Sequence, residues 1–414
     1  MQFSRFAQRY TEHSGIVQLM EDLGEAMAGS GPRYMLGGGN PAHIPEVEAF
    51  FQERMQRLVQ DPAEFSHFIG NYDPPRGEMR FINALADLFR DEYGWNIGPQ
   101  NIVLTAGSQS AFFLLFNMLA GEFPDGSHKR ILLPLTPEYI GYSDVGLTDD
   151  YFAACKPEIE TFDDHTFKYH VDFEALHIGD DIGALCVSRP TNPTGNVLSD
   201  EEMQRLSDLS RAAGVPFIVD NAYGMPFPNI IFTKAGLHWD DHIILCMSLS
   251  KLGLPGARTG IIIACEQVVE AVARMNGIFN LAMGSLGPVL ALDLVRSREV
   301  IRLSNNVIQP YYRRKAEFAL QCFRRELDGV DYYIHKAEGA IFLWLWFPGL
   351  PVSSEELYRR LKDKGVLVLS GHYFFPGLKE DWPHRHECIR VSYAMPDQVV
   401  SEGIRLIAEE VKGL

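Results

Sequence analysis

Short apolar runs recur along the first two thirds of this 414-residue chain and alternate with segments that have helical periodicity. One of these helices is clearly delimited, because Ser199 and Glu202 form a capping box and Gly214 supplies a stop signal. Alternating strands and helices predict an α/β fold with a mostly parallel sheet flanked by helices. The predicted strands lie at 103, 131–135, 184–187, 217–219, 243–247 and 260–264.

The length of the chain exceeds that of one typical domain, so two domains are expected. After about residue 290 the pattern changes to a long charged helical stretch, followed by strand-like runs at 340–346 and 388–393. We therefore predict a large domain over residues 45–290. Residues 1–44 together with 291–414 are predicted to form a smaller α+β domain.

One lysine, Lys251, stands in the run SLSKLGLPGARTG directly after the apolar residues 243–247. Its amine is expected to emerge from the end of a buried strand, where burial lowers the pKa and favours the neutral form that Schiff-base chemistry requires. Ser248 and Ser250 add hydroxyl donors, and Arg258 adds a planar cation suited to phosphate. An isolated lysine is usually a solvated surface charge, but this combination indicates a pocket for a covalently held anionic cofactor.

Polar residues also follow other predicted strands. Asp220 ends the run GVPFIVD, Asn192 lies in the rigid turn SRPTNPTG, and Ser108 and Gln109 begin a helix after TAG. Because ligands bind at the carboxyl edge of a parallel sheet, these residues are expected to face one site. A helix start offers free N–H groups to a phosphate, and an asparagine amide can donate to a phenolate oxygen. Taken singly, each residue also has an ordinary explanation as a helix cap or a turn residue.

Arg390 stands inside the strand-like run CIRVSY near the carboxyl end. A buried arginine requires an anionic partner. That partner is either a substrate carboxylate or an acidic side chain of the protein, and the residues alone leave both open.

Taken together and in this chain order, the motifs resemble those of the fold-type I pyridoxal-phosphate aminotransferases, the aspartate aminotransferase superfamily. The resemblance implies that Lys251 binds pyridoxal 5′-phosphate covalently and moves the substrate α-proton. It also implies that Asp220 pairs with the protonated pyridine nitrogen, so that the ring accepts electrons. Tyr223 and Asn192 are then expected to hydrogen-bond the cofactor O3′.

The resemblance places further residues around the cofactor. Ser108 and Gln109 are expected on its phosphate. Tyr139 is expected to stack on the pyridine face. Tyr72 resembles the tyrosine that reaches the phosphate of the neighbouring subunit, which implies a homodimer. The donors that complete the expected cofactor site are Ser248, Ser250 and Arg258.

For the substrate, the resemblance implies that Arg390 grips the α-carboxylate, with the backbone of Gly39 and the amide of Asn192 beside it. The implied reaction is ping-pong transamination between an amino acid and a 2-oxo acid. Family members that act on dicarboxylic amino acids often carry a second arginine, and residues 277–290 contain none. The motifs LGGGNP, YDPPRG and SGHYFFPGL further resemble the members that exchange amino groups among valine, alanine, pyruvate and 3-methyl-2-oxobutanoate.

Two alternatives stay open at this level. Lys251 and Asp220 would also serve other pyridoxal-phosphate chemistry, such as that of a β-lyase or a synthase. A pyridoxal-phosphate-sensing regulator is disfavoured, because the family motifs begin too close to Met1 to leave room for a basic DNA-binding module. The excess of 54 acidic over 37 basic residues, a formal charge of −17, likewise disfavours nucleic acid and anionic membranes as partners.

The six cysteines are widely spaced and form no C-x-x-C motif. This pattern predicts reduced thiols and a cytoplasmic location. The run HRHEC at 384–388 is interpreted as a strand lead-in, so no metal site is expected. No segment reaches membrane-spanning length.

Overall fold

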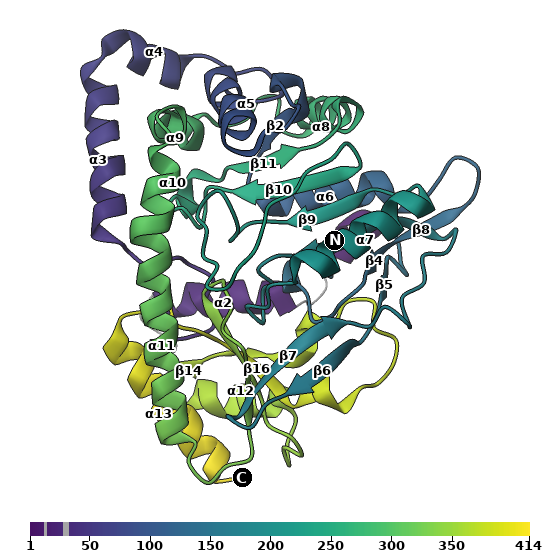
Figure 1. The fold of residues 1–414 in the computed structure, drawn as a ribbon, viewed down its shortest axis with the longest axis vertical. Coiled ribbons are helices and arrows are strands. Elements are labelled where there is room, and N and C mark those ends of the chain that lie inside the picture. Colours follow the sequence, from purple (N-terminus) through teal and green to yellow (C-terminus); the bar gives the residue numbers. More distant parts are fainter. Residues whose placement is uncertain (12–14, 28–32) are drawn as a thin grey trace.

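The predicted apolar runs form the core of an eight-stranded sheet in the computed structural model, which describes residues 1–11, 15–27 and 33–414. The spatial order is β2-β11-β10-β9-β8-β4-β3, and β5 pairs with β4 (Figure 1). The strands are β2 (Ile102–Thr105), β3 (Gly121–Glu122), β4 (His128–Leu133), β5 (Phe152–Ala154), β8 (Ile182–Ser188), β9 (Phe217–Asp220), β10 (Ile243–Ser248) and β11 (Gly260–Ile263).

The central strands β4, β8, β9 and β10 run parallel, whereas β11 is antiparallel to both of its neighbours. The predicted α/β class with a mostly parallel sheet is therefore confirmed. The register aligns Ser188 with Asp220 and Asp220 with Cys246, so the carboxyl ends of three strands meet at one edge. The strand predicted at 131–135 begins earlier, at His128, and ends at Leu133.

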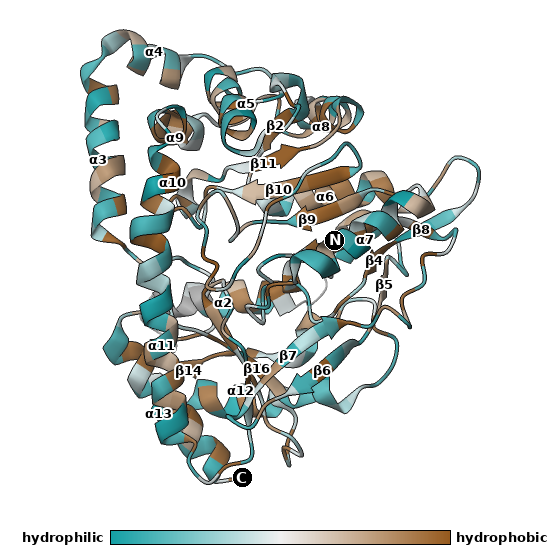
Figure 2. Cartoon of the chain, viewed as in Figure 1, coloured by the Kyte–Doolittle hydropathy of each residue, from teal (hydrophilic) through white to brown (hydrophobic). Residues whose placement is uncertain are grey.

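Helices cover both faces of this sheet. Side chains alternate along each strand, so Ile218 and Ile244 pack on one face with α6 and α8, whereas Phe217 and Leu245 pack on the other with α5, α7 and α9. Figure 2 shows that these inner strands are the most hydrophobic part of the ribbon. The helices of this part are α3 (Pro45–Gln60), α4 (Pro62–Gly70), α5 (Met79–Tyr93), α6 (Ser108–Leu119), α7 (Asp200–Ala213), α8 (Glu266–Phe279) and α9 (Leu286–Arg296).

A second sheet, of six strands, lies in the lower part of Figure 1 with the order β15-β16-β13-β12-β7-β6. Its strands are β6 (Pro157–Thr161), β7 (Thr166–Val171), β12 (Tyr333–His335), β13 (Phe342–Trp346), β15 (Leu369–Ser370) and β16 (Cys388–Ser392). The pairing of β7 with β12 joins a segment of the predicted large domain to the sheet of the carboxyl-terminal region. The division of the chain near residues 44 and 290 stays a prediction.

The remaining helices flank this second sheet or connect it to the first. They are α1 (Arg5–Thr11), α2 (Gly15–Met27), α10 (Glu299–Leu303), α11 (Gln309–Glu326), α12 (Ser354–Asp363) and α13 (Asp397–Lys412), with a π-helical turn at Ser304–Ile308. Figure 1 shows α11 descending along one side from the upper to the lower layer. Near the amino end, β1 (Tyr34–Met35) pairs with β14 (Val366–Leu367). Short 3-10 turns occur at Pro99–Asn101, Ile140–Tyr142, Pro255–Ala257, Gly371–Phe374 and Pro383–His386.

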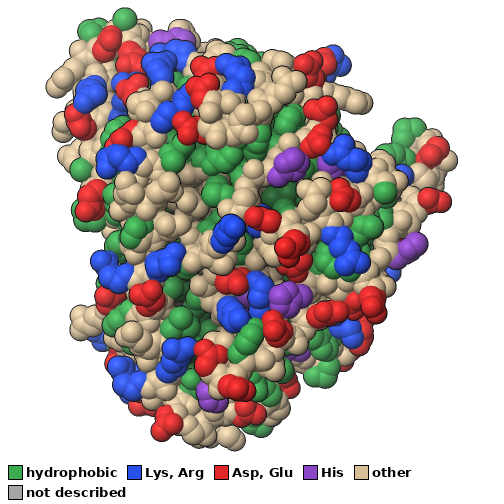
Figure 3. Space-filling model, in the orientation of Figure 1, with side chains coloured by type: hydrophobic (Ala, Val, Ile, Leu, Met, Phe, Trp, Pro, Cys, Tyr) green, Lys and Arg blue, Asp and Glu red, His purple; other side chains and the backbone are tan. Residues whose placement is uncertain are grey.

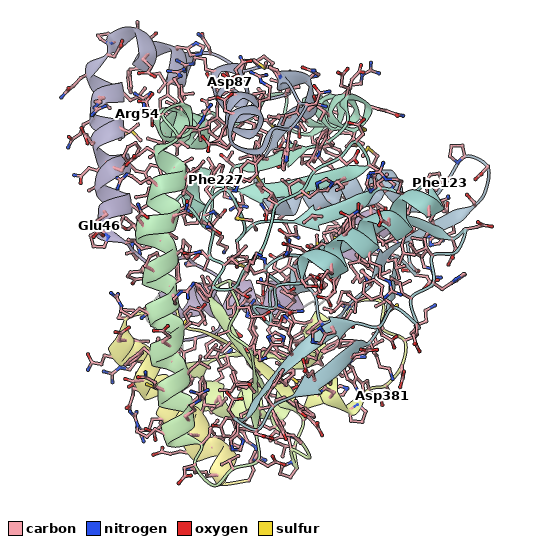
Figure 4. The ribbon with its side chains drawn as sticks, viewed as in Figure 1. Glu46, Arg54, Asp87, Phe123, Phe227 and Asp381 are labelled. Carbon is pink, nitrogen blue, oxygen red and sulfur yellow. The ribbon has the colours of Figure 1, made fainter. Side chains whose placement is uncertain are left out.

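Ion pairs fasten the outer helices. Arg54 on α3, labelled in Figure 4, donates to Glu64 of α4 at 2.6 Å and to the carbonyl of Val289 on α9 at 3.2 Å. Figure 3 shows charges of both signs interspersed over the face in view. None of the described helices has the length and apolar character needed to cross a membrane. No group of metal-ligating side chains is found in residues 1–11, 15–27 and 33–414.

The capping box predicted for α7 is confirmed. The Ser199 hydroxyl accepts the N–H of Glu202 at 3.1 Å, the Glu202 carboxylate accepts the N–H of Ser199 at 2.8 Å, and Gly214 ends the helix at φ +67°. We predict that Ser199→Ala lowers the free energy of unfolding by about 1 kcal/mol, because the N–H of Glu202 loses the hydroxyl that accepts it. Urea unfolding followed by circular dichroism measures the change. Ser401→Ala, at a half-buried position within α13 and away from any helix cap, is the control, and equal effects would contradict the capping role.

Candidate active site

Lys251 lies in the turn that follows β10, as its sequence context predicts. The side chain is half-buried, and Nζ donates a hydrogen bond to the carbonyl of Gly39. Nζ lies 5.3 Å from the ring centroid of Tyr223. The lysine is thus enclosed between the end of the central sheet and the amino-terminal segment around Gly39.

The electrostatic surroundings favour a neutral Lys251. Burial, together with the cations Arg390 and Arg258, lowers the pKa of its amine to about 8, and Asp220 acts in the opposite direction. A pKa near 8 leaves about one amine in ten uncharged at pH 7, far more than for a solvated lysine. An uncharged amine is a nucleophile and a proton acceptor.

Asp220 ends β9 beside Lys251 and is 8% exposed. One carboxylate oxygen accepts the hydroxyl of Tyr142 at 2.8 Å, and the other accepts the N–H of Ala222 at 3.0 Å. Burial raises the pKa of Asp220 to about 6, and these two hydrogen bonds together with Lys251 act in the opposite direction. The carboxylate is therefore fixed in orientation at the sheet edge.

Three residues beside Asp220 were missed by the sequence reasoning. Tyr142, Ser188 and Glu138 form a buried hydrogen-bonded group, in which Ser188 N–H donates to Glu138 at 2.7 Å. The only sequence signals were weak: Ser188 begins the SRPTNPTG turn, and Glu138 and Tyr142 flank Tyr139. Their proximity to Asp220 depends on the pairing of β8 with β9 and on the 3-10 turn at Ile140–Tyr142.

Arg390, on β16 of the second sheet, is 2% exposed and reaches the same site. Its guanidinium donates to Asn192 Oδ1 and to the carbonyl of Gly37, each at 2.6 Å, while Nε is buried without a partner. No carboxylate pairs with Arg390 among the described residues, which removes the intraprotein ion pair left open by the sequence. Burial lowers its pKa to about 10, so it stays cationic at neutral pH.

Aromatic rings enclose the arginine and the lysine. The Arg390 guanidinium carbon lies 3.9 Å from the ring centroid of Phe342 and 5.3 Å from that of Phe374. Tyr223 is buried, with its ring centroid 6.1 Å from that of Phe342. Tyr139 is half-buried and packs edge-on against Tyr142. The space between Lys251 and Arg390 is therefore bordered largely by apolar faces.

The amino end of α6 forms a second polar part of the site. Gly107 precedes the helix at φ +91°, and no side chain caps the first turn, so the N–H groups around Ser108 and Gln109 lack intrahelical partners. The Arg258 guanidinium lies directly against Gly107. A Cβ atom on residue 107 would lie only 2.2 Å from Arg258 Nη2, so a larger residue would clash with the guanidinium. Gln109 donates to the Gly141 carbonyl at 2.8 Å. Free N–H groups beside a guanidinium form an anion-binding arrangement.

Two predicted serines differ in their surroundings. Ser248 is 2% exposed, and its hydroxyl accepts the N–H of Ser250 at 3.0 Å, so it helps to shape the turn. Ser250 is half-buried. Tyr72 is 83% exposed and lies outside this cluster in the single chain.

The Aminotransferase class I and II family model matches residues 47–407. The chain therefore belongs to this family of aminotransferases, which transfer amino groups between amino acids and 2-oxo acids with pyridoxal phosphate. It is 49% identical to the valine–pyruvate aminotransferase of Escherichia coli (strain K12) over 412 residues, covering 100% of this chain and 98% of that protein.

Two solved structures are also similar along nearly their whole length. A crystal structure of valine-pyruvate aminotransferase from Salmonella typhimurium LT2 has a TM-score of 0.88 and 49% identity, covering 96% of this chain and 98% of that one. A crystal structure from Psychrobacter arcticum 273-4, described as an amino-acid aminotransferase, has a TM-score of 0.97 and 49% identity, covering 100% and 99%.

We predict that Arg390→Lys raises the KM for the amino-acid substrate about tenfold to hundredfold. The variant keeps the positive charge but loses the planar fork, and each charge-assisted hydrogen bond contributes about 1.5–3 kcal/mol. Steady-state kinetics measures KM, and the visible spectrum of the loaded enzyme should be unaltered. Arg359→Lys, an exposed arginine paired with Glu356 on α12, is the control. An unaltered KM would place the carboxylate anchor elsewhere.

We also predict that Lys251 of the cofactor-free protein reacts with a small aldehyde and a reductant at lower pH than exposed lysines do. The labelling rate should rise with pH and level off above about pH 8, because the lowered pKa releases the free amine there. Peptide mass spectrometry measures labelling at each site. A rate that follows that of exposed Lys412 at every pH would contradict the lowered pKa.

Proposed function

We propose that this chain catalyses ping-pong transamination of small aliphatic L-amino acids, with valine and alanine as donors and pyruvate and 3-methyl-2-oxobutanoate as acceptors. The observation that carries the proposal is the buried Arg390, whose Nε has no partner, in the same site as the neutral-prone Lys251. A buried cation with an unused donor is suited to binding the carboxylate of a substrate. A lysine with a lowered pKa is suited to accepting a proton from the carbon next to that carboxylate.

The chemistry of the donors supports a pyridoxal-phosphate site. The unpaired N–H groups of Ser108 and Gln109 and the guanidinium of Arg258 would hold the phosphate. An alanine at Gly107 would occupy the position of the Arg258 guanidinium, so the absence of a side chain there keeps this cradle open. Ser250 would add a hydroxyl donor from the lysine turn, while Ser248 shapes that turn.

The residues around the ring position fit the same group. Both carboxylate oxygens of Asp220 accept hydrogen bonds from the protein, and Asp220 would pair with the pyridine nitrogen. Asn192 must turn Oδ1 toward Arg390, because a guanidinium only donates, and this leaves its NH₂ to donate to O3′. Tyr223 would donate to the same oxygen, and Tyr139 would cover the ring face.

When bound, pyridoxal phosphate supplies an electron sink for the pair released as the substrate α-proton leaves. Lys251 Nζ would accept that proton and deliver it again, which requires the free amine that burial favours. Arg390 would hold the α-carboxylate so that the α-carbon lies near Nζ, with Gly39 beside it. The Gly39 carbonyl, which accepts from Lys251, would keep the amine in position.

The preference for small aliphatic side chains rests on three points. The 49% identical protein is named valine–pyruvate aminotransferase, and residues 277–290 hold no arginine for a second carboxylate. The rings of Phe342 and Phe374 beside Arg390 also favour an apolar substrate.

We further propose a homodimer in the cytoplasm. Tyr72 is 83% exposed in the single chain and would reach the phosphate site of the partner subunit. Three exposed apolar residues at the carboxyl end of α8 and just beyond it, Ile278, Phe279 and Leu281, would be covered in such a dimer.

The test is a single turnover of the loaded enzyme with valine or alanine and no acceptor. We expect one equivalent of the 2-oxo acid per site and conversion of the cofactor to its aminated form, followed by full reversal on addition of pyruvate. Lys251→Ala should slow this conversion at least about a hundredfold to ten-thousandfold, because no group then moves the α-proton. Stopped-flow absorbance and quantification of the oxo acid measure both.

Lys412→Ala, at the exposed end of α13, is the matched control. Release of ammonia in place of the aminated cofactor would indicate lyase chemistry instead. Equal rates for aspartate and valine would contradict the proposed side-chain preference.

A further inference from the structure

We infer that Glu138 is a protonated, neutral carboxylic acid that positions Asp220 through a buried chain of hydroxyl groups, Glu138–Ser188–Tyr142–Asp220. Glu138 is a positioning residue and touches no substrate. The inference rests on the proposed role of Asp220 as the partner of the pyridine nitrogen.

The four groups come from three separate segments and meet beneath the site. Glu138 lies just before the 3-10 turn that carries Tyr142, while Ser188 and Asp220 end the adjacent strands β8 and β9. The Ser188 hydroxyl contacts Glu138 Oε2, the Tyr142 hydroxyl lies 3.3 Å from Ser188 Oγ, and it lies 2.8 Å from Asp220 Oδ2. The chain of oxygen atoms is therefore continuous.

Glu138 is 1% exposed, and no ion pair to it occurs in the described part of the chain. The groups that face it are the N–H of Ser188 at 2.7 Å, the N–H of Tyr139 at 3.3 Å, and the buried Cys186, Tyr142 and Asp220. None of these groups is a cation. A buried carboxylate without a cation, close to a second carboxylate, is costly, so one of the two acids retains a proton.

The number of protons that these hydrogen bonds require also indicates that one of the two acids is protonated. The chain contains three oxygen–oxygen contacts, each of which needs one proton to be a hydrogen bond, and the two hydroxyl groups supply two. The third comes from a carboxyl group. Asp220 is stabilised as an anion by Lys251, whereas Glu138 has no such neighbour, and burial raises the pKa of Glu138 to about 8 but that of Asp220 only to about 6. Glu138 is thus the acid that keeps the proton.

The hydrogen bonds then run in one direction. Glu138 donates to Ser188, Ser188 donates to Tyr142, and Tyr142 donates to Asp220. Asp220 is the final acceptor, and each hydrogen bond in such a chain strengthens the next. Because Glu138 is neutral, it places no second negative charge beside Asp220. Asp220 would then remain an oriented anion, able to pair with the pyridine nitrogen of the bound cofactor.

Infrared spectroscopy of protein with isotope-labelled glutamate tests the proton directly, without substrate. At pH 7 we expect the wild type to show the C=O stretch of a protonated glutamate, both with and without cofactor. The same band should be absent from the spectrum of Glu138→Gln. If the wild type and Glu138→Gln have the same glutamate bands in this region, Glu138 is ionised and the inference is overturned.

The positioning role is tested by a pair of variants in the loaded enzyme. Glu138→Leu removes the donor to Ser188, and we expect kcat to fall about tenfold to hundredfold with little change in KM. Glu138→Gln keeps a donor for Ser188 Oγ and an acceptor for its N–H, and should rescue most of this loss. An equal loss in both variants would show that the negative charge is needed and would overturn the inference, and the infrared test holds even if Glu138→Leu does not fold.

Asp220→Asn separates this inference from the proposed function. If Asp220→Asn transaminates at the wild-type rate while the Glu138 band persists, the proposed role of Asp220 fails and Glu138 is neutral for another reason. If Asp220→Asn is crippled and no Glu138 band exists in the wild type, the proposed function stands and the inference alone fails.

Discussion

Burial of Arg390 without a carboxylate partner is the constraint on which the rest of the site depends. Desolvating a guanidinium is costly, and here two neutral oxygens, from Asn192 and Gly37, and two aromatic rings offset that cost, with Nε left unpaired. The same cation lowers the pKa of Lys251. One buried positive charge therefore carries an unused hydrogen-bond donor and adds to the effect of burial on the lysine amine.

The amino-terminal segment connects the two sheets at this point. The carbonyl of Gly37 accepts from Arg390 of the second sheet, and the carbonyl of Gly39 accepts from Lys251 at the edge of the first. Leu36 also accepts the N–H of Ser392 at 2.7 Å. A change in the position of this short segment would therefore alter the surroundings of Arg390 and of Lys251 together.

Beneath the site, buried polar groups are hydrogen-bonded to one another. Asp220 has its two oxygens fixed by Tyr142 and Ala222, and the chain continues through Ser188 to Glu138. In a low-dielectric interior such oriented groups lose little energy to rearrangement during a reaction. The hydrogen bonds to Asp220 oppose the rise in its pKa that burial causes, and they fix its orientation at the sheet edge.

Local patterns in the sequence were sufficient to predict that polar residues follow the strands, that Ser199 and Gly214 delimit α7, and that Lys251 lies just beyond a strand end. These features depend on neighbours only a few residues apart. The sequence could not predict the neighbours of Asp220 or of Arg390. Glu138 approaches Asp220, and Gly37 approaches Arg390, only when distant segments pair, and β6 and β7 join the second sheet although they lie within the predicted large domain. The sequence by itself determined the helices and strands and the reactive groups that they carry. Long-range packing decided which of these groups lie together away from water. Their pKa values follow from that packing, because desolvation disfavours the charged form.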